Sequence, residues 1–303
     1  MNQQWASNNV QVHLLDATYE LFRSHFAPRP QSLDPEGRPV NATVGLIEST
    51  LYLLREEGVT HLACASDHII ESWRNERWPT YKTGAGVDPM LSRQFAQGEE
   101  ALRALGVVVW PLVEWEADDG LGTAARRFED APGVERVVVM TPDKDMAQLV
   151  REDGRVVQYD RRQRQLIDAD GVRKKFGVSP ESIPDFLALV GDSSDGYPGI
   201  PGWGKVSAGA VLTRYGHLED IPEKVTHWDL SLRGAATLAA SLREHRDLAF
   251  LFRELATLVF DVPLVSESLD DLRWKGAHRA EFTAFAQRLG QPRLIERVHR
   301  WAD

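Results

Sequence analysis

The chain has 303 residues, of which 43% are hydrophobic and 26% charged, and its formal net charge is −10. These values are typical of a soluble globular protein with one large or two modest cores. The negative charge argues against a nucleic-acid-binding protein, which usually carries a basic surface, unless many of the acids gather in one metal site.

The N-terminal part of the sequence shows no targeting segment. Residues 1–16 lack the basic and apolar regions of a signal peptide. No stretch of the sequence approaches the roughly 18 apolar residues of a membrane span. The single cysteine, Cys64, lies in an apolar run and cannot form an internal disulfide. We therefore expect a cytoplasmic protein with a buried thiol and no membrane partner.

Four apolar segments predict strands of a parallel sheet that is buried on both faces. They are residues 10–16, 61–67, 106–110 and 136–143. Helical periodicity predicts helices between them at 44–58, which ends in a glycine, and at 116–130, which begins with acids. Strands that alternate with helices indicate an α/β fold with right-handed crossovers.

The pattern changes beyond about residue 155. Residues 155–168 predict a hairpin, and helices separated by Gly/Pro loops follow to the end of the chain. We expect an α/β domain over 1–175 and a mostly helical domain over 176–303. Residues 28–40 are polar and rich in proline, which indicates a surface loop.

Three of the four predicted strands end in aspartate, at Asp16, Asp67 and Asp143. A single aspartate in such a place is usually a helix cap or a turn residue. In open α/β sheets, however, ligands bind beyond the carboxyl ends of the strands, and a parallel sheet brings those ends to one edge. Three aspartates at equivalent ends therefore favour a shared site.

Six further carboxylates stand close to one another in the sequence. The complete set of nine acids is Asp16, Asp67, Glu116, Asp118, Asp119, Asp143, Asp145, Asp192 and Asp195. No cysteine or histidine cluster accompanies them in the sequence, which argues against zinc or a softer metal. Oxygen ligands in this number predict two or more Mg²⁺ or Mn²⁺ ions. Lys144, between two of the acids, is expected to point away from the metal site.

Two segments have features that bind phosphate, and without the nine acids the net charge of the chain would be only −1. In the first, Arg74, Arg77 and Lys82 alternate with Trp73, Trp78 and Tyr81. Basic side chains bind phosphate and aromatic faces stack on bases, but a half-buried amphipathic helix would show the same pattern. In 198–212, glycines allow a tight turn, and the amides of the following helix can hold a phosphate.

In this order, the segments resemble the bacterial and phage 5′–3′ exonuclease and flap endonuclease family, which includes the 5′-nuclease domain of DNA polymerase I. The matching motifs are L-L-D at 14–16, W-R-N at 73–75, Y-K at 81–82, E-A-D-D at 116–119, T-P-D-K-D at 141–145, G-D-S-S-D at 191–195 and P-G-I-P-G-W-G at 198–204. Each motif alone is weak, but their order and spacing over about residues 10–265 make the resemblance specific.

The resemblance implies a PIN-like fold, with a mostly parallel sheet and flanking helices, followed by a helical region with a helix–hairpin–helix-like (H2TH or SAM-like) DNA-binding element. It implies that all nine acids bind Mg²⁺ or Mn²⁺. Arg74 and Lys82 are then expected to act on the scissile phosphodiester, with Tyr81 beside the lysine. Contacts to DNA are implied for Arg77, Gly199, Gly202, Gly204, Lys205 and Ser207, and the glycine-rich element is expected to bind K⁺.

The predicted function is that of a metal-dependent nuclease that hydrolyses DNA with a free 5′ end or a 5′ flap in replication or repair. No polymerase region follows residue 303, so we expect a standalone monomeric enzyme. Recognition should depend on backbone and junction shape, because nothing in the sequence resembles a base-reading helix. Two alternatives stay open: a PIN-like metal-dependent ribonuclease, and a DNA-junction-binding protein whose catalysis has decayed.

Three positions depart from the family pattern. Ala85 stands where an arginine usually follows the lysine of the Y-K motif. Val206 stands where the hairpin usually has a lysine, with Lys205 beside it, and Ser66 precedes Asp67 where an aromatic residue is common. None of these departures removes a predicted metal ligand, so they concern substrate contacts rather than the activity itself.

Overall fold

The computed structural model describes residues 10–265 and 268–302. Two compact units can be distinguished by contacts between Cα atoms. Unit 1 consists of the described parts of 1–70, 84–140 and 260–303, and unit 2 consists of 71–83 and 141–259. The predicted lack of a signal peptide concerns mainly residues 1–9, which lie outside the described residues. Among the described helices, none has both the length and the apolar character to cross a membrane.

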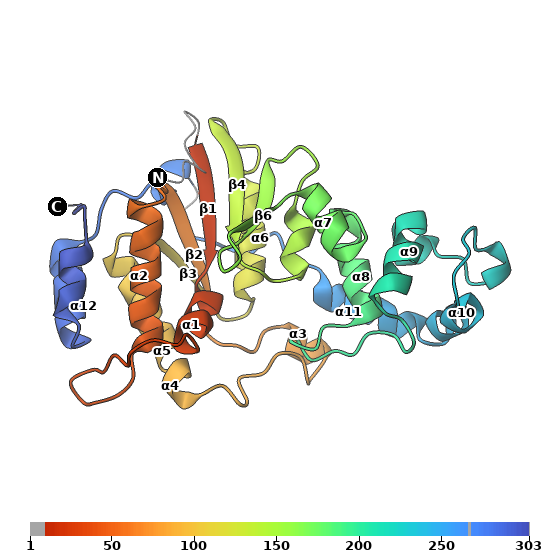
Figure 1. Ribbon diagram of the computed structural model, residues 1–303, viewed down its shortest axis with the longest axis horizontal. Coiled ribbons are helices and arrows are strands. Elements are labelled where there is room, and N and C mark those ends of the chain that lie inside the picture. The colour runs from red at the N-terminus through yellow and green to blue at the C-terminus, as the bar shows by residue number, and fades with distance from the viewer. Residues whose placement is uncertain (1–9, 266–267, 303) are drawn as a thin grey trace. The chain divides into compact units, whose positions relative to one another are not determined.

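Four parallel strands form the sheet of unit 1, in the order β3-β2-β1-β4 (Figure 1). Their bounds are β1 Val10–Asp16, β2 His61–Asp67, β3 Val108–Leu112 and β4 Val134–Met140. All of β2 and the last six residues of β1 are buried, because these inner strands are covered on both faces. The predicted parallel sheet is confirmed, and Cys64 of β2 is buried and forms no disulfide, as expected.

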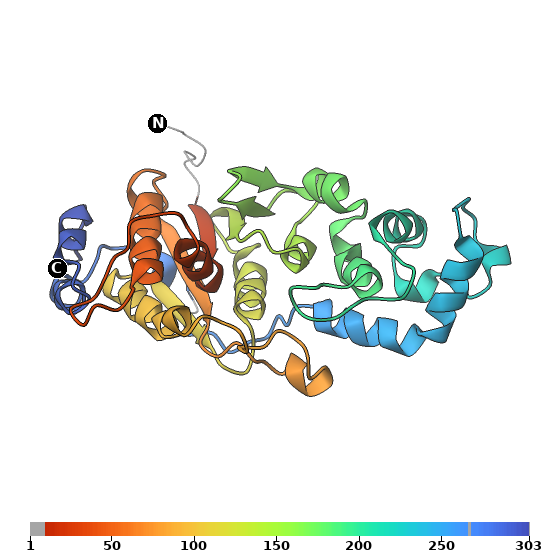
Figure 2. The same cartoon turned by 60° about the horizontal axis from the view of Figure 1, so that its bottom comes forward.

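Unit 1 has helices on both faces of this sheet and further helices that pack on those. They are α1 (Ala17–His25), α2 (Asn41–Arg55), α4 (Pro89–Ser92), α5 (Gln94–Ala104), α6 (Ala117–Phe128) and α12 (Arg279–Arg288), with short 3₁₀ helices at Leu269–Leu272 and Pro292–Arg297. The chain steps from β1 to β2 and β3, and then returns past β1 to β4. Right-handed connections therefore put α1, α2 and α5 on one face and α6 on the other (Figures 1 and 2).

The strand order reverses between β1 and β4. In open α/β sheets, the crevice beyond the carboxyl ends of the strands at such a reversal is where ligands bind. Asp16 is the last residue of β1, and Asp143 follows the end of β4 by three residues. The topology of unit 1 therefore places Asp16 at the edge of the sheet at which a ligand site is expected.

Strand β3 begins and ends two residues later than predicted. Gly106 adopts a positive φ of 74° and closes the turn after α5, in which Val107 N still donates to Leu102 O at 3.0 Å. Extended structure therefore starts only at Val108. The strand then includes Pro111, which is tolerated because β3 is an edge strand of the described sheet.

Strand β4 ends at Met140, earlier than the predicted limit at Asp143. Pro142 explains the difference, because a proline has no N–H with which to continue the ladder of hydrogen bonds. The loop that carries the predicted metal ligands thus begins directly after the last buried residues of the strand.

His13 makes the stability of unit 1 sensitive to acid. It lies in β1, and burial lowers its pKa from 6.5 to about 4. Below about pH 6.5 the unfolded chain binds a proton that the folded chain does not take up, so the free energy of unfolding falls as the pH decreases toward 4. We expect a loss of about 2 kcal/mol from this group between pH 7 and pH 5.

Urea unfolding at several pH values measures this effect. The free energy of unfolding of wild-type protein should fall more steeply between pH 7 and pH 5 than that of His13→Leu. The variant has no imidazole to protonate, whereas its other titrating groups are unchanged. Parallel pH profiles for the two proteins would contradict the assignment to His13.

Unit 2 contains a hairpin followed by helices. Its strands, β5 (Val156–Asp160) and β6 (Gln165–Ile167), are antiparallel, which confirms the predicted hairpin. Its helices are α3 (Arg74–Arg77), α7 (Ala169–Phe176), α8 (Ile183–Val190), α9 (Lys205–Tyr215), α10 (Ala235–Glu244) and α11 (Arg246–Ala256), with short 3₁₀ helices at Asp145–Leu149, Pro180–Ser182, Leu218–Asp220 and Val225–His227. Apolar side chains such as Val172, Leu187 and Phe252 form its core.

Helix α3 is much shorter than the aromatic and basic segment 73–82. It ends at Arg77, and Trp78 is extended, with φ −141° and ψ 98°. Trp78 precedes Pro79, and the ring of a proline drives the residue before it out of the helical region. The basic and aromatic residues of the segment therefore do not share one face of an amphipathic helix.

Candidate functional site

Two aspartates at the carboxyl ends of neighbouring strands are fixed by backbone N–H groups. Asp16 ends β1 and caps α1, and its Oδ1 accepts a hydrogen bond from Tyr19 N at 2.8 Å. Asp67 ends β2, and its Oδ1 accepts from Ala117 N, the first residue of α6, at 2.7 Å. The N–H of Asp67 in turn donates to Thr18 Oγ1 at 2.8 Å. These bonds orient both carboxylates before any ligand binds.

The first turn of α6 adds three more acids of unit 1 to the same edge of the sheet. Glu116 caps this helix, and its N–H donates to Asp119 Oδ2 at 3.2 Å. Carboxylate oxygens of Asp118 and Asp16 lie within 4.8 Å of each other. None of the five acids of unit 1 is more than 8% exposed; they are Asp16, Asp67, Glu116, Asp118 and Asp119.

The donor set of unit 1 fits a hard divalent cation. It consists of carboxylate oxygens, the ligands that Mg²⁺ and Mn²⁺ prefer. Oxygens bound to one Mg²⁺ at about 2.1 Å are roughly 3–4 Å apart, so Asp16 and Asp118 can share an ion with little movement. Burying several like charges together is unfavourable, and a divalent cation would offset that repulsion.

The loop after β4 supplies acids that belong to unit 2. Asp143 is exposed, and Asp145 opens a 3₁₀ turn in which its Oδ1 accepts from Met146 N at 2.9 Å. Lys144 was expected to point away from the predicted metal ligands, and that prediction is wrong. Its Nζ lies 2.7 Å from Oδ2 of Asp192, so the lysine neutralises one of the acids in this structure.

Gln158 was not identified from the sequence as part of the site. It lies in β5 and is fully buried, and its Nε2 donates to Thr141 O at 3.0 Å and to Asp143 O at 2.6 Å. These bonds hold the backbone of the acidic loop. A glutamine in the otherwise apolar start of the segment 156–160 is the signal that could have revealed it.

Asp192 lies in a tight loop that glycines make possible. Asp192 and Tyr197 exchange two backbone hydrogen bonds, at 3.0 and 3.1 Å. Gly191 and Gly199 both have positive φ, 78° and 73°, and their backbones are in close contact. Burial raises the pKa of Tyr197 well above its usual range, and the charges of Asp195 and Asp192 raise it further. The ring therefore stays neutral at physiological pH.

The contact between the two glycines predicts a large cost for a side chain. A Cβ on Gly199 would lie 2.4 Å from Gly191 N, so Gly199→Ala should lower the free energy of unfolding by about 3 kcal/mol, through steric overlap and the positive φ. Gly202→Ala is the matched control, because its φ is 84° but nothing lies within 4 Å of the added Cβ. We expect a loss of about 1 kcal/mol in the control. Equal losses in chemical denaturation would contradict the role of the contact.

The predicted residues of the segment 73–82 are bound to protein groups of unit 2. Arg74 is 2% exposed, and its guanidinium donates to backbone carbonyls at the end of α11. Arg77 forms a bidentate pair with Glu254, at 2.9 and 2.8 Å, on the surface. Tyr81 is buried, and Lys82 N donates to Asp195 O at 2.9 Å. The segment thus brings Lys82 to the loop that carries two predicted metal ligands.

The glycine-rich segment leads into an open helix N-terminus. Gly204 caps α9 and exchanges hydrogen bonds with Ser207 Oγ, both at 3.0 Å. No atom lies within 4 Å of a Cβ built on Gly202 or Gly204, so a ligand can approach this backbone. Lys205 is exposed beside it, and Val206 is 82% exposed. Val206 is uncharged at the position where the family pattern has a lysine. The lysine of this chain, Lys205, lies one residue earlier.

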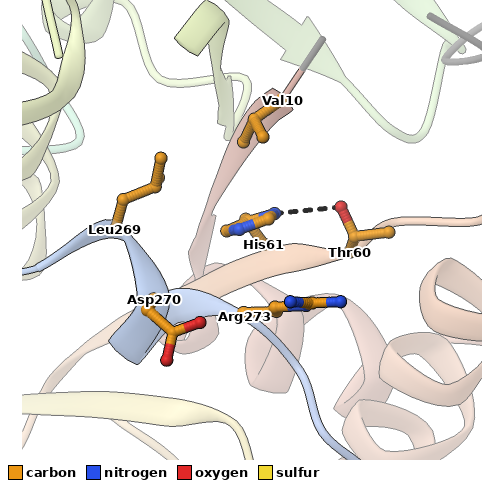
Figure 3. A pocket seen from close by; sticks show the side chains of 6 residues that line it. All are labelled: Val10, Thr60, His61, Leu269, Asp270 and Arg273. Atoms are coloured by element: carbon orange, nitrogen blue, oxygen red, sulfur yellow. Dashed lines mark hydrogen bonds between the residues drawn. The ribbon is translucent and has the colours of Figure 1, made fainter. Parts of the chain in front are cut away.

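A separate cavity of about 490 Å³ lies at the amino ends of β1 and β2 (Figure 3). Val10 and His61, the first residues of β1 and β2, line it together with Thr60, Leu269, Asp270 and Arg273. The Thr60 hydroxyl lies 3.0 Å from His61 Nδ1. Burial, and then the charge of Arg273, lower the pKa of His61. The cavity has no part in the predicted chemistry.

Comparisons with known proteins agree with this fold. Residues 11–177 match the family model "5'-3' exonuclease, N-terminal resolvase-like domain", and residues 178–280 match "5'-3' exonuclease, C-terminal SAM fold". DNA polymerase I of Bacillus caldotenax is 33% identical over 291 residues, which cover 94% of this chain and 32% of that protein. The chain thus spans about a third of the length of this curated relative.

Two solved structures share the fold. The T5 5'-exonuclease with bound divalent zinc ions has a TM-score of 0.62 and 14% identity, and the match covers 94% of this chain and 96% of that chain. The catalytic core of Rad2 in complex with DNA substrate has a TM-score of 0.61 and 16% identity, covering 95% and 90%. The expected sheet with flanking helices and the SAM-like C-terminal region are confirmed. The chain belongs to the 5′–3′ exonuclease family.

Proposed function

We propose that the chain is a structure-specific 5′ nuclease that hydrolyses DNA at a free 5′ end or a 5′ flap with the help of divalent metal ions, Mg²⁺ or Mn²⁺. The observation that carries the proposal is the group of five buried carboxylates at the carboxyl edge of the unit 1 sheet. Membership of the 5′–3′ exonuclease family supports it. Action as a monomer in DNA replication or repair is part of the same proposal.

The metal ligands of the proposed enzyme are the nine acids of both units. Asp16 and Asp118, both in unit 1, are carboxylates well placed to share one ion. Divalent ions, when bound, supply positive charge at the attacked phosphate and lower the pKa of a water molecule. The backbone N–H groups that hold Asp16 and Asp67 keep these carboxylates oriented without reorganisation.

Residues of unit 2 are proposed to hold the DNA backbone. The exposed backbone at the start of α9, with Gly202, Gly204, Lys205 and Ser207, is proposed to bind a phosphate without reading a base. Gly199 contributes indirectly, through its contact with Gly191. Arg77 is proposed to exchange its exposed partner Glu254 for a phosphate. Binding of K⁺ by the glycine-rich turn stays a prediction.

Lys82 is proposed to place its ammonium group beside the scissile phosphate. A positive charge held there stabilises the negative charge that develops in the transition state. Tyr81 precedes it and is buried, so its role in the proposed reaction is to support the lysine rather than to meet the DNA.

Cleavage of a labelled 5′-flap DNA with Mg²⁺, with Mn²⁺ and with EDTA tests the proposed function. We expect incision near the base of the flap with either metal and none with EDTA, and weaker binding as the salt concentration rises. A wild-type protein that cleaves RNA flaps in preference to DNA would favour the ribonuclease alternative. Tight binding to the DNA junction without cleavage in either metal would favour the decayed DNA-binding protein.

A further inference from the structure

We propose that Arg74 is a positioning residue, which fixes the segment 73–82 to the end of α11 so that Lys82 is held at the Asp192–Tyr197 loop. The inference rests on the proposed nuclease function for its activity measurements. It replaces the expectation that Arg74 itself acts on the phosphodiester. All groups in the argument belong to unit 2.

The guanidinium of Arg74 binds the last carbonyls of a helix. Its Nε donates to Leu255 O at 2.7 Å, and its Nη2 donates to Thr257 O at 3.0 Å. Both carbonyls lie at the C-terminus of α11, where backbone oxygens have no N–H partner within the helix and the helix dipole is negative. A buried cation at this point satisfies the helix end, and DNA can touch the 2% exposed side chain only if the segment leaves α11.

Arg74 also orders the aromatic residues next to it. Its guanidinium carbon lies 4.7 Å from the ring centre of Trp73 and 6.0 Å from that of Tyr81. The ring of Tyr81 stacks on Tyr197, with centroids 6.3 Å apart and planes 7° apart. Arg74 and Tyr197 therefore fix the residue directly before Lys82.

Further contacts fix the backbone between Arg74 and Lys82. Asn75 Nδ2 donates to Tyr81 O at 2.7 Å, which closes the segment on itself. Trp78 packs edge-on against Phe252 of α11, with ring centroids 5.2 Å apart, and its Nε1 donates to Gly196 O at 3.1 Å. Each contact constrains the direction in which the chain reaches the lysine.

The segment also fits closely against the Asp192–Tyr197 loop. A Cβ on Gly196 would lie 2.3 Å from Thr80 O, and Lys82 N donates to Asp195 O at 2.9 Å. Arg74 is the buried charged group that joins this segment to α11, whereas Arg77 pairs with Glu254 of the same helix at the surface. The loss of Arg74 should therefore displace Lys82 without removing a DNA contact. The loss of an arginine that binds phosphate would instead remove a DNA contact and leave Lys82 in place.

Single-turnover cleavage and DNA binding of Arg74→Gln and Arg74→Lys distinguish the two roles. For both variants we expect a cleavage rate that is about 10–100-fold lower, an effect typical of supporting groups, with the Kd for flap DNA within about twofold of wild type. The slope of log Kd against log salt should not change. The proposal would be overturned if Arg74→Gln reduced the magnitude of this slope by about one unit while Arg74→Lys kept the wild-type cleavage rate. These results would show that Arg74 contacts a phosphate.

The cleavage rate of a double variant at Arg74 and Lys82 distinguishes a positioning role of Arg74 from a general loss of structure. In a Lys82→Ala background, Arg74→Lys should lower the remaining rate by less than about threefold, because interacting residues are not additive. A full additional loss would overturn the proposal. Arg214→Gln, which removes an arginine from an exposed pair with Asp229, is the control for loss of a surface charge and should cleave like wild type.

A measurement without cleavage keeps the inference separate from the proposed function. NMR of ¹³C-methylated lysines should show a Lys82 signal that moves in Arg74→Lys and stays in place in Arg214→Gln. If wild-type protein does not cleave DNA while the Lys82 signal depends on Arg74, the proposed function fails and the positioning role stands. An unchanged Lys82 signal in Arg74→Lys would overturn the positioning role whatever the activity.

Discussion

Asp118→Asn is expected to lower flap cleavage at saturating DNA by at least about 100-fold, more than the loss of a group that only supports a ligand. The amide replaces a charged carboxylate by a weak neutral ligand, at a point where an oxygen of Asp16 lies within 4.8 Å. The side chain keeps its size, so packing around the buried position is retained. A gel assay of single-turnover rates measures the effect.

Metal binding by the folded protein should change together with the rate. Mn²⁺ that binds only the folded state raises the melting temperature, and we expect a smaller rise for Asp118→Asn than for wild type. Asp261→Asn removes an exposed carboxylate from the same unit and should match wild type in both assays. Unchanged cleavage and an unchanged Mn²⁺-induced shift in Asp118→Asn would exclude Asp118 from the metal site.

Lys82→Ala is expected to have the next largest effect, a rate of cleavage lowered by about 100-fold or more. A group that stabilises charge in the transition state contributes little to binding of the ground state, so the Kd for flap DNA should change only slightly. Lys82→Arg should recover part of the rate, because it retains the charge but not the shape of the ammonium group.

Lys174→Ala provides the control for this experiment, since Lys174 is an exposed lysine of unit 2. It should retain the wild-type rate at saturating DNA. The opposite result would be an unchanged cleavage rate at saturating DNA, with the Kd raised by the same factor by which the rate falls at low DNA concentration. Lys82 would then be a binding residue, and the proposed transition-state role would be wrong.

The sheet of unit 1 could be predicted from the sequence for a physical reason. Inner parallel strands are buried on both faces and therefore appear as short continuous apolar runs, as in 61–67. Acids at the ends of such parallel strands lie at the same edge of the sheet. The sequence could therefore predict that Asp16 and Asp67 lie at one edge. The predicted range of the edge strand β3 was two residues too early. Its start is determined by the turn at Gly106 and not by the hydrophobic pattern.

The environment of the basic residues could not be predicted in the same way. Arg74 contacts a carbonyl 181 residues further along the chain, and Lys144 pairs with an acid 48 residues away. A local pattern of arginine and aromatic residues is the same whether the arginine faces DNA or a helix end. Only the long-range fold decides between these two environments, so a short motif specifies the residue type but not its partner.

The bond between Arg74 and Leu255 O also bears on the order of folding. The loop that it closes costs about 2 kcal/mol more entropy than a loop of about 20 residues, a modest difference for stability. During synthesis, however, the segment 71–83 leaves the ribosome long before α11 exists to bind it. Lys82 therefore reaches its final place only after residue 257 has been made, which delays the arrangement proposed for activity until most of the chain is complete.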